Sequence, residues 1–198
     1  MSVGVGVIGT GVMGSEHARL FSRETPDAYL AGVFDADAAR AQAAAAGATV
    51  FPDPRSLIAS DRVGAVIIAS PDVTHAELTL ACLEAGKPVL CEKPLASSAA
   101  DALRVVQAEA ALKRRLIQVG YMRRFDPGYQ EMKRIKDEGG VGATVLLHNV
   151  HRNVRAPEWF TGPMAVTNSF VHEIDISRWL TGSEMVSAHV AIGPAAIR

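Results

Sequence analysis

The chain has 198 residues, enough for one sizeable hydrophobic core or for one domain and part of another. Its composition, 48% hydrophobic and 21% charged, is typical of a globular protein, and a net charge of −1 argues against nucleic acid or a membrane surface as the main partner. No window approaches the roughly 18 consecutive apolar residues of a membrane span, and the N-terminus lacks the basic region of a signal peptide, so we expect a cytoplasmic protein.

The first 120 residues alternate between short apolar runs and amphipathic segments. The predicted strands are Val3–Ile8, Leu30–Phe34, Ala65–Ala69, Pro88–Leu90 and Leu116–Val119. The predicted helices are Val12–Arg23, Asp37–Ala46, Pro54–Ala59, Thr74–Ala85 and Ser98–Lys113. Strands that alternate with helices imply a parallel sheet covered by helices on both faces. We therefore predict a doubly wound α/β domain over residues 1–120.

The pattern changes after Gly120 to that of an α+β domain. The predicted elements are a helix over Asp126–Glu138, a strand over Thr144–Asn153, a helix over Asn168–Leu180 and a strand over Val186–Ile192. Two strands make a poor independent sheet. We therefore expect residues 121–198 to be an incomplete α+β domain that serves substrate binding and oligomerisation.

A glycine-rich motif follows the first predicted strand and opens the first predicted helix. Its residues are Gly9, Thr10, Gly11, Val12, Met13 and Gly14, in the spacing GxGxxG, and Asp35 stands 21 residues after Gly14 at the end of the second strand. The glycines allow a tight turn, a close approach of the backbone to a pyrophosphate, and close packing of helix on strand. The N–H groups at the helix N-terminus favour the phosphates. This context predicts a dinucleotide-binding Rossmann domain, and a glycine-rich turn without a ligand is the alternative.

Asp35 predicts which dinucleotide binds. A carboxylate at this place accepts hydrogen bonds from the adenosine ribose hydroxyls and repels a 2′-phosphate. The next two residues, Ala36 and Asp37, offer no arginine or lysine to neutralise that phosphate. The sequence therefore favours NAD over NADP.

Two more segments are expected at the same edge of the sheet, because parallel sheets bind ligands at the carboxyl ends of their strands. The candidate cofactor contacts in these segments are Ser70, Pro71, His75, Glu92 and Lys93. From composition alone, Lys93 could equally be a solvated loop residue before a proline. For His75 a structural role is an equal alternative.

Four motifs together resemble the Gfo/Idh/MocA oxidoreductase family: Gly9–Gly14, Glu92–Pro94, Gly120–Pro127 and His172–Asp175. Within that family the chain is most similar to the inositol dehydrogenases, over its whole length. The resemblance implies transfer of hydride from a secondary alcohol of a cyclitol or sugar, such as myo-inositol, to NAD. It also implies a C-terminally truncated chain, and a homo-oligomer for the full-length protein. Another sugar dehydrogenase of the family, or an NAD-binding module without turnover, remains an alternative.

The resemblance assigns roles to individual residues. It implies that Lys93 is catalytic, that His172 accepts the proton, and that Met122 and Arg123 contact the substrate. Many inositol dehydrogenases have an aspartate four residues before the histidine, where this chain has Asn168. A helix would place Asn168 and His172 on one face, so Asn168 could bind a hydroxyl, but it lacks the charge that raises the basicity of a histidine. The proton relay and the identity of the polyol therefore stay open.

Further polar residues are expected on the strand over Thr144–Asn153. His148 and His151 would lie on opposite faces, whereas His151 and Asn153 would share one. Two polar groups on one face suit a polyhydroxylated substrate, and inositol dehydrogenases place substrate contacts at the matching positions. A solvent-facing polar stripe is the alternative.

The remaining candidates are interpreted as structural. Cys82 and Cys91 are expected to be buried hydrophobes without a disulfide, and His17 is expected on a helix face. Asp175 and Arg178, three residues apart on the predicted His172 helix, are interpreted as forming a surface or interdomain salt bridge, with catalysis as the alternative. No cysteine or histidine cluster has zinc spacing, so no metal is expected.

Overall fold

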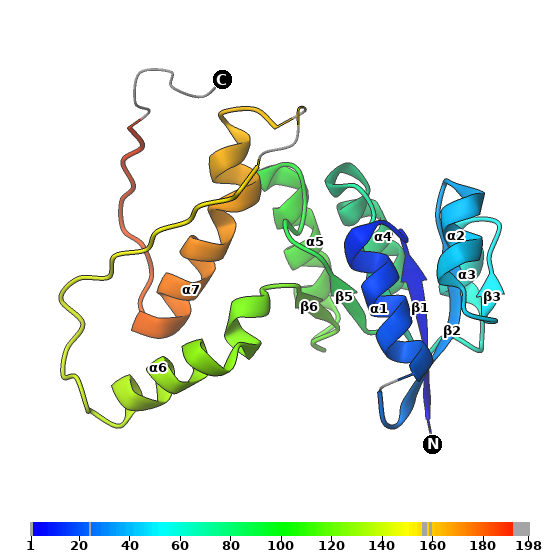
Figure 1. The fold of residues 1–198 in the computed structure, drawn as a ribbon, viewed down its shortest axis with the longest axis horizontal. Coiled ribbons are helices and arrows are strands. Elements are labelled where there is room, and N and C mark those ends of the chain that lie inside the picture. The colour runs from blue at the N-terminus through cyan, green and yellow to red at the C-terminus, as the bar shows by residue number, and fades with distance from the viewer. Residues whose placement is uncertain (1, 24, 156–157, 159, 192–198) are drawn as a thin grey trace. The chain divides into compact units, whose positions relative to one another are not determined.

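The structure is a computed structural model that describes residues 2–23, 25–155, 158 and 160–191 (Figure 1). It divides into two compact units, Met1–Gly120 and Tyr121–Arg198. Each unit is described separately below.

The first unit is built on a parallel sheet of six strands. The strands are β1 (Val3–Ile8), β2 (Ala28–Phe34), β3 (Thr49–Val50), β4 (Ala65–Ile68), β5 (Val89–Cys91) and β6 (Ile117–Val119). Their order is β3-β2-β1-β4-β5-β6, and every neighbouring pair is parallel. This order confirms the predicted doubly wound fold. Strand β3 was not predicted, because two residues are too few to show a periodic pattern.

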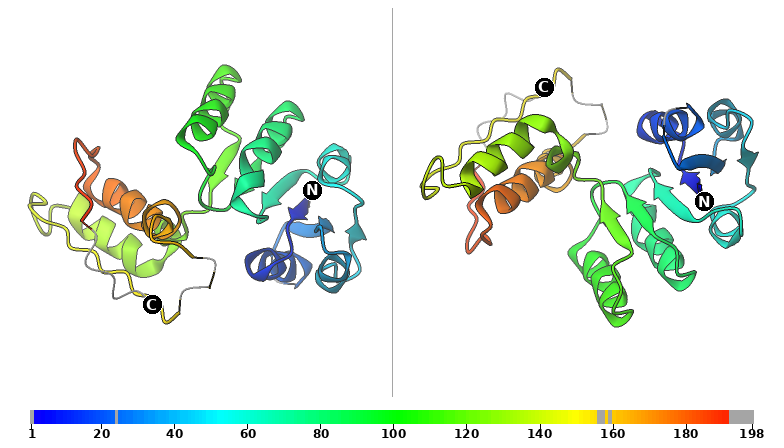
Figure 2. Two further views of the ribbon diagram at one scale, coloured as in Figure 1. Left: turned by 90° about the horizontal axis from the view of Figure 1, so that it is seen from above. Right: turned by 90° about the horizontal axis from the view of Figure 1, so that it is seen from below.

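Helices cover both faces of this sheet (Figure 2). Helices α1 (Val12–Arg23) and α2 (Ala38–Ala44) lie on one face. Helices α3 (Pro54–Ala59), α4 (His75–Glu84) and α5 (Ala99–Ala111) lie on the other, and the short turn η1 (Asp72–Thr74) precedes α4. The side chains of Asp37, Asp53 and Ser98 accept hydrogen bonds from the first N–H groups of α2, α3 and α5, which is how such residues begin helices.

The hydrophobic core forms a layer on each side of the sheet, because successive residues of a strand point to opposite faces. In β1, Val5 and Val7 belong to one apolar cluster together with Ala18 of α1, and Ile8 belongs to the other, together with Leu57 of α3. The buried residues of both layers are aliphatic, apart from Cys82 and Cys91 in the layer of Ile8, and partly buried phenylalanines pack against each layer. The carboxyl ends of the strands, and the loops that follow them, are thereby held on a rigid base.

The second unit contains η2 (Met122–Phe125), α6 (Pro127–Asp137), a single π-helical turn η3 (Ala165–Ser169) and α7 (Val171–Thr181). Asp126 caps α6 by accepting hydrogen bonds from the N–H groups of Gly128 and Tyr129. Gly182, with φ of 68°, ends α7 in the left-handed conformation that favours glycine. No helix of the described residues is long and apolar enough to cross a membrane.

Three predictions for this unit are wrong. None of the described residues after Val119 forms a strand, so neither Thr144–Asn153 nor the described part of Val186–Ile192 is one, and Ile192 lies outside the described residues. A strand needs a neighbour to pair with its backbone. Asn149 and His151 of this segment instead contact helix α7 through their side chains. The predicted helix over Asn168–Leu180 begins only at Val171, because a π-helical turn precedes it.

Candidate functional site

The glycine-rich loop between β1 and α1 is shaped by close backbone contacts. Gly9 has φ of 85°, and an added Cβ would lie 2.5 Å from the backbone nitrogen of Ser70. A Cβ on Gly14 would lie 1.8 Å from the carbonyl oxygen of Gly9. A Cβ on Gly11 would meet nothing within 4 Å. The loop therefore packs tightly on one side and is open at Gly11, beside the N-terminus of α1, as a pyrophosphate site requires.

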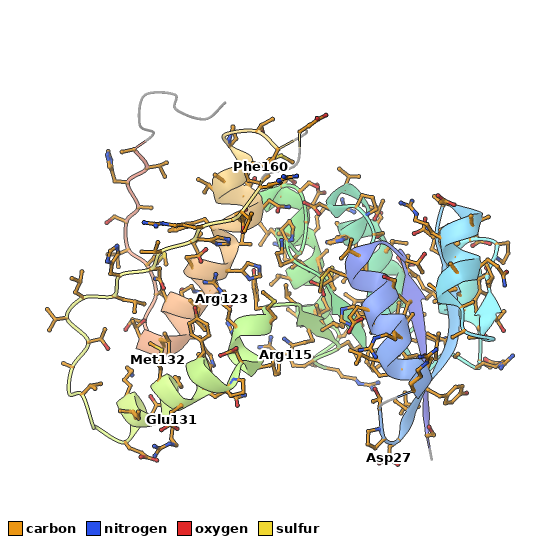
Figure 3. The ribbon with its side chains drawn as sticks, viewed as in Figure 1. Asp27, Arg115, Arg123, Glu131, Met132 and Phe160 are labelled. Carbon is orange, nitrogen blue, oxygen red and sulfur yellow. The ribbon has the colours of Figure 1, made fainter. Side chains whose placement is uncertain are left out.

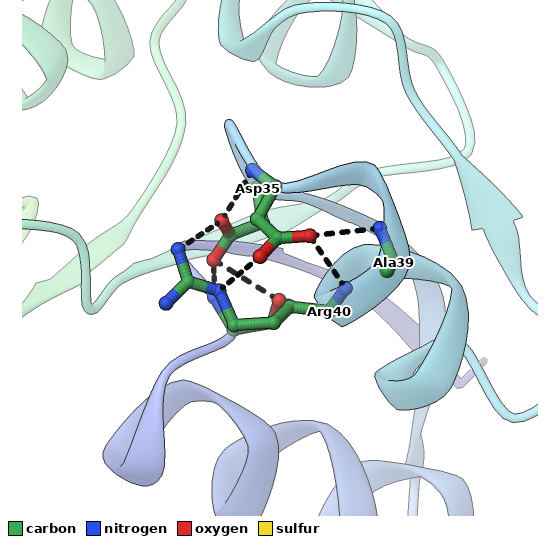
Figure 4. Close-up of polar contacts among 5 residues, drawn as sticks. Asp35, Ala39 and Arg40 are labelled. Carbon is green, nitrogen blue, oxygen red and sulfur yellow. Dashed lines mark hydrogen bonds and ion pairs between the residues drawn. The ribbon is translucent and has the colours of Figure 1, made fainter.

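Asp35, the residue after β2, is hydrogen-bonded to this loop and to residues of its own segment (Figure 4). Its Oδ2 accepts hydrogen bonds from the backbone nitrogen and the hydroxyl of Thr10, at 2.7 and 3.1 Å. Its Oδ1 accepts from the backbone nitrogen of Asp37 at 2.8 Å and from Nη2 of Arg40 at 3.1 Å. The Asp35 side chain is only 8% exposed. The carboxylate is thus held at the end of β2 by the residues around it.

The charge of Asp35 is maintained by these contacts. Burial by itself would raise the pKa of the carboxyl group, but hydrogen bonds from Asp37 and Thr10 and the charge of Arg40 hold its pKa below the usual value. The group is therefore ionised at neutral pH. An ionised carboxylate can accept hydrogen bonds only, which suits two ribose hydroxyls.

A cavity of about 690 Å³ gathers several of the predicted cofactor residues. Its lining includes Gly9, Gly11, Asp35, Ser70, Pro71 and also Arg40, which the sequence interpretation missed. The loops after β1, β2 and β4 supply these residues, except for Arg40, which lies on α2. Side chains from well-separated parts of the sequence thus meet at the carboxyl edge of the sheet, where parallel α/β sheets bind ligands.

His75 lies beneath this edge rather than in the cavity. It is 1% exposed. Its Nδ1 is 2.7 Å from the carbonyl oxygen of Pro94 and its Nε2 is 2.9 Å from that of Ser70. The ring therefore joins the Ser70 turn to the turn that contains Lys93, and this placement supports an indirect role, through the positions of these two turns.

Glu92 and half-buried Lys93 follow β5, and Glu92 has an unexpected partner. Nε2 of His17, on α1, lies 2.9 Å from Oε1 of Glu92. Burial would raise the pKa of Glu92, but the hydrogen bond and charge of His17 and the proximity of Lys93 lower it. His17 was expected only on a helix face. The pair could not be predicted, because 75 residues separate its members and no local spacing connects them.

In the second unit, a buried carboxylate connects two predicted substrate contacts. Glu173 of α7 is 2% exposed, and its Oε1 lies 2.5 Å from Nη1 of Arg123 and 3.1 Å from Nδ1 of His151. Figure 3 labels Arg123, which lies on η2 and is 18% exposed. The other ring nitrogen of His151 is 3.2 Å from Oδ1 of Asn153. His151 and Asn153 therefore lie side by side, but not on the shared strand face that was predicted, because their segment is not a strand.

Glu173 was not singled out by the sequence analysis, although it stands next to His172. Burial would raise the pKa of its carboxyl group, but hydrogen bonds from His151 and Arg123 and the charge of Arg123 lower it. Glu173 is therefore ionised at neutral pH. Its place within the motif His172–Asp175 was the available sequence signal.

A second ion pair joins the same two elements of this unit. Asp175 of α7 accepts hydrogen bonds from Nε and Nη2 of Arg124, at 2.9 and 2.5 Å. Arg178 bonds instead to Glu184, at 2.7 Å. Asp175 and Arg178 thus each form a salt bridge with a different partner in the same unit, and only the pair of Arg178 lies at the surface.

The three remaining predicted residues lie on elements of the same unit. His172 is on the first turn of α7 and is 8% exposed, Asn168 is half-buried in the π-helical turn, and Met122 is exposed on η2. Asn168 and His172 belong to different helical elements, so the shared face expected from a continuous α-helix does not apply. Cys82 and Cys91 are buried and free of disulfides, as predicted. The described residues contain no group of three or more metal-ligating side chains.

A six-stranded parallel sheet, an open glycine loop at a helix N-terminus and an ionised aspartate after the second strand together define a dinucleotide-binding Rossmann protein. The chain belongs to the Gfo/Idh/MocA family: residues 3–121 match the oxidoreductase family with an NAD-binding Rossmann fold, and residues 129–196 match the family's C-terminal domain.

The chain is similar to curated inositol dehydrogenases. It is 54% identical over 194 residues to inositol 2-dehydrogenase 1 of Saccharopolyspora erythraea. The matched region covers 96% of this chain and 58% of that protein. It is 46% identical to inositol 2-dehydrogenase of Gluconacetobacter diazotrophicus, again over 96% of this chain and 58% of that protein. The chain therefore spans little more than half the length of these relatives.

Solved structures show the same similarity. The myo-inositol dehydrogenase of Lactobacillus casei in complex with NAD(H) and myo-inositol is 35% identical with a TM-score of 0.87, covering 92% of this chain and 55% of that one. The scyllo-inositol dehydrogenase of Lactobacillus casei with bound NAD(H) and scyllo-inositol is 25% identical, with a TM-score of 0.75, covering 92% and 57%.

Proposed function

We propose that the chain binds NAD(H) and takes part in the oxidation of a secondary alcohol on a cyclitol or sugar. The observation that carries this proposal is the open glycine loop, with the ionised Asp35 beside it in one cavity. Gly9–Gly14 would hold the pyrophosphate, Asp35 the adenosine ribose, and Ser70 and Pro71 would line the cavity. His75, Glu92 and Lys93 would shape the next part of the cofactor site. When bound, NAD supplies a hydride acceptor.

The catalytic roles follow from the chemistry of the side chains that the family resemblance selects. His172 would take the proton of the substrate hydroxyl as general base. Lys93 would donate a hydrogen bond to the same oxygen and stabilise the negative charge that develops there. Asn168 would hydrogen-bond a neighbouring hydroxyl.

A polyhydroxylated substrate is supported by the polar side chains of the second unit. His151 and Asn153 lie 3.2 Å apart and present nitrogen and oxygen atoms together. Arg123 and Met122, on η2, would contribute a cation and an apolar surface. The relatives named inositol 2-dehydrogenase and the structure solved with myo-inositol support a cyclitol, with myo-inositol as the first candidate. Assembly of the full-length protein as a homo-oligomer stays a prediction.

The proposal is tested by calorimetric titration of the 198-residue chain with NADH, with and without myo-inositol, together with assays of NAD reduction across a panel of polyols. We expect NADH binding that myo-inositol strengthens, and reduction of NAD by the preferred polyol. The control is Gly14→Ala, which should weaken NADH binding. A native chain that binds no NADH contradicts the proposal. If NADH binds with the same affinity in the presence of every polyol, the chain binds the cofactor but not the proposed substrate.

A further inference from the structure

His75 is a fully buried histidine between two turns that the proposed reaction uses. It is the first residue of α4 and is 1% exposed. Its Nδ1 lies 2.7 Å from the carbonyl oxygen of Pro94, in the turn after β5, and its Nε2 lies 2.9 Å from that of Ser70, in the turn after β4. One imidazole ring thus connects the turn that lines the cofactor cavity to the turn that contains Lys93.

We propose that His75 is a positioning residue for hydride transfer, which fixes Lys93 relative to the bound cofactor by holding both turns. This inference rests on the proposed function, in which Ser70 lines the cofactor site and Lys93 contacts the reacting oxygen. It deepens that function by naming the side chain that keeps these two groups at a fixed separation. At 1% exposure, His75 has almost no surface with which to contact a ligand itself.

The first argument concerns the backbone at the ends of β4 and β5. These strands are parallel neighbours, and the N–H group of Glu92 donates a hydrogen bond to the carbonyl oxygen of Ile68, at 2.9 Å. Ser70 and Pro94 each lie two residues beyond this bond. His75 therefore connects the two chains where they leave the sheet, so that the position of one turn depends on the position of the other.

The second argument concerns the hydrogen atoms of the ring. A carbonyl oxygen only accepts hydrogen bonds, so each ring nitrogen holds its turn only when it carries a hydrogen. A ring with hydrogen on both nitrogens makes both contacts hydrogen bonds, and a buried polar group without a partner is costly. The geometry therefore suits one ring that donates to Ser70 and Pro94 at once.

The third argument concerns the cost of a displaced turn. Hydride transfer needs the reacting atoms about 3 to 3.5 Å apart, and a misplacement of about 1 Å can lower the rate about a hundredfold. The Ser70 turn has further support, because the Ser70 hydroxyl lies 2.6 Å from that of Thr74 and the Ser70 backbone packs against Gly9. Loss of the bond to Pro94 should therefore have the larger effect, and this effect should appear in kcat.

Two amide substitutions separate the two bonds. The side-chain nitrogen of asparagine takes the place of Nδ1 of histidine, and that of glutamine takes the place of Nε2. His75→Asn should therefore keep the bond to Pro94 and lose the bond to Ser70, and His75→Gln should do the reverse. We expect His75→Gln to lower kcat at least about tenfold, with NADH affinity within about threefold of native. We expect His75→Asn to weaken NADH binding about fivefold, with kcat at saturating NAD within about threefold of native.

A control variant and a second measurement accompany this test. Leu83 is also buried on α4, at 4% exposure, but lies eight residues along the helix from His75. Leu83→Ala should lower the melting temperature and leave kcat and NADH affinity unchanged. Amide hydrogen exchange follows the two turns without any need for turnover. Residues 92 to 97 should exchange faster in His75→Gln only, and residues 70 to 74 in His75→Asn only.

The outcomes separate this inference from the proposed function. Parallel losses of kcat and NADH affinity in both amide variants, or unchanged exchange in both turns, overturn the positioning role. Long-range ¹H–¹⁵N spectra of the native chain should show hydrogen on both ring nitrogens of His75, and a bare nitrogen overturns the link made by that nitrogen. A native chain that binds no NADH contradicts the proposed function, whereas exchange that rises separately in the two turns still supports the link through His75.

Discussion

The two units of the chain are stabilised by different kinds of interaction. Among the described residues, the buried apolar side chains lie in the first unit, except for Ile176 and Leu180. The second unit buries three polar side chains on α7 alone: His172, Glu173 and Asp175. Two of these are carboxylates, and each pairs with an arginine of η2.

This difference has a physical consequence for how each unit depends on its sequence. Apolar burial is non-directional and proportional to area, so many aliphatic residues can replace one another in the first unit. A buried carboxylate is stable only with its charged partner in place. The second unit therefore depends on particular residue pairs, such as Glu173 with Arg123 and Asp175 with Arg124.

The largest expected effect compares one isoleucine from each unit. Ile68 and Ile176 are both fully buried, but Ile68 belongs to a ten-residue apolar cluster. Ile68→Ala should lower the free energy of unfolding by about 4 kcal/mol and Ile176→Ala by about 2 kcal/mol, because fewer apolar neighbours surround the second site. Amide hydrogen exchange, followed separately in peptides of the two units, measures both. An equal or larger loss for Ile176→Ala would remove the contrast between the units.

The next effect concerns the glycine loop of the first unit. Gly14→Ala should lower the free energy of unfolding by about 3 kcal/mol, because the new Cβ collides with backbone that has little room to move. Gly11→Ala should change the free energy of unfolding by less than about 1 kcal/mol. Both should weaken NADH binding, the second through contact with the pyrophosphate alone. Thermal melting and calorimetry on the same samples separate the two effects. A Gly11→Ala protein that melts as early as Gly14→Ala would contradict the assignment of the open side.

A smaller effect is expected for the ion pairs of the second unit. Glu173→Gln should lower the free energy of unfolding by about 2 kcal/mol. This loss is smaller than that for breaking a fully buried ion pair, because Arg123 reaches solvent. Asp175→Asn is the matched control: it breaks the neighbouring pair with Arg124 but has no contact with His151. Long-range ¹H–¹⁵N spectra should show a changed balance of His151 tautomers in Glu173→Gln only. The same change in both variants would indicate general loosening of the unit.

The stabilising effect of Glu173 should depend on pH. Its pKa is lowered in the folded state, so the folded protein holds the proton less tightly than the unfolded chain. The stabilisation is therefore present above the ordinary pKa of glutamate and is lost as pH falls through the lowered value. The difference in unfolding free energy between the native chain and Glu173→Gln should narrow between about pH 7 and about pH 3. A constant difference would show that the carboxylate charge contributes nothing.

The smallest effect leaves stability unchanged and concerns the cysteines of the apolar core. Burial, as the largest cause, raises the pKa of both Cys82 and Cys91 to about 12, and only the thiolate reacts quickly. Iodoacetamide should therefore label the native chain at least about a hundredfold more slowly than the chain in urea. Rapid labelling of either cysteine under native conditions would show that the core of the first unit opens frequently.

The outcome of the sequence analysis follows the same division between the units. In the first unit, buried strands and amphipathic helices leave a clear periodic signal, and the glycine spacing with Asp35 depends on local geometry. In the second unit, the alternating pattern of Thr144–Asn153 predicted a strand, but alternation alone does not supply a pairing partner. Asn149 instead contacts Ser177, and His151 contacts Glu173. The first two residues are two apart in their segment, and their partners are four apart on helix α7.

The sequence by itself determined the parallel sheet, the glycine loop, Asp35 at the end of β2 and the family, because each depends on periodicity or on spacing within a few turns of chain. Only the tertiary structure decided that Arg40 contacts Asp35, that His17 contacts Glu92 and that Glu173 joins Arg123 to His151. Charged side chains carry no periodic signal of their partners. Their pairing depends on which elements the apolar core and the turns bring together, so it becomes visible only when the fold is known.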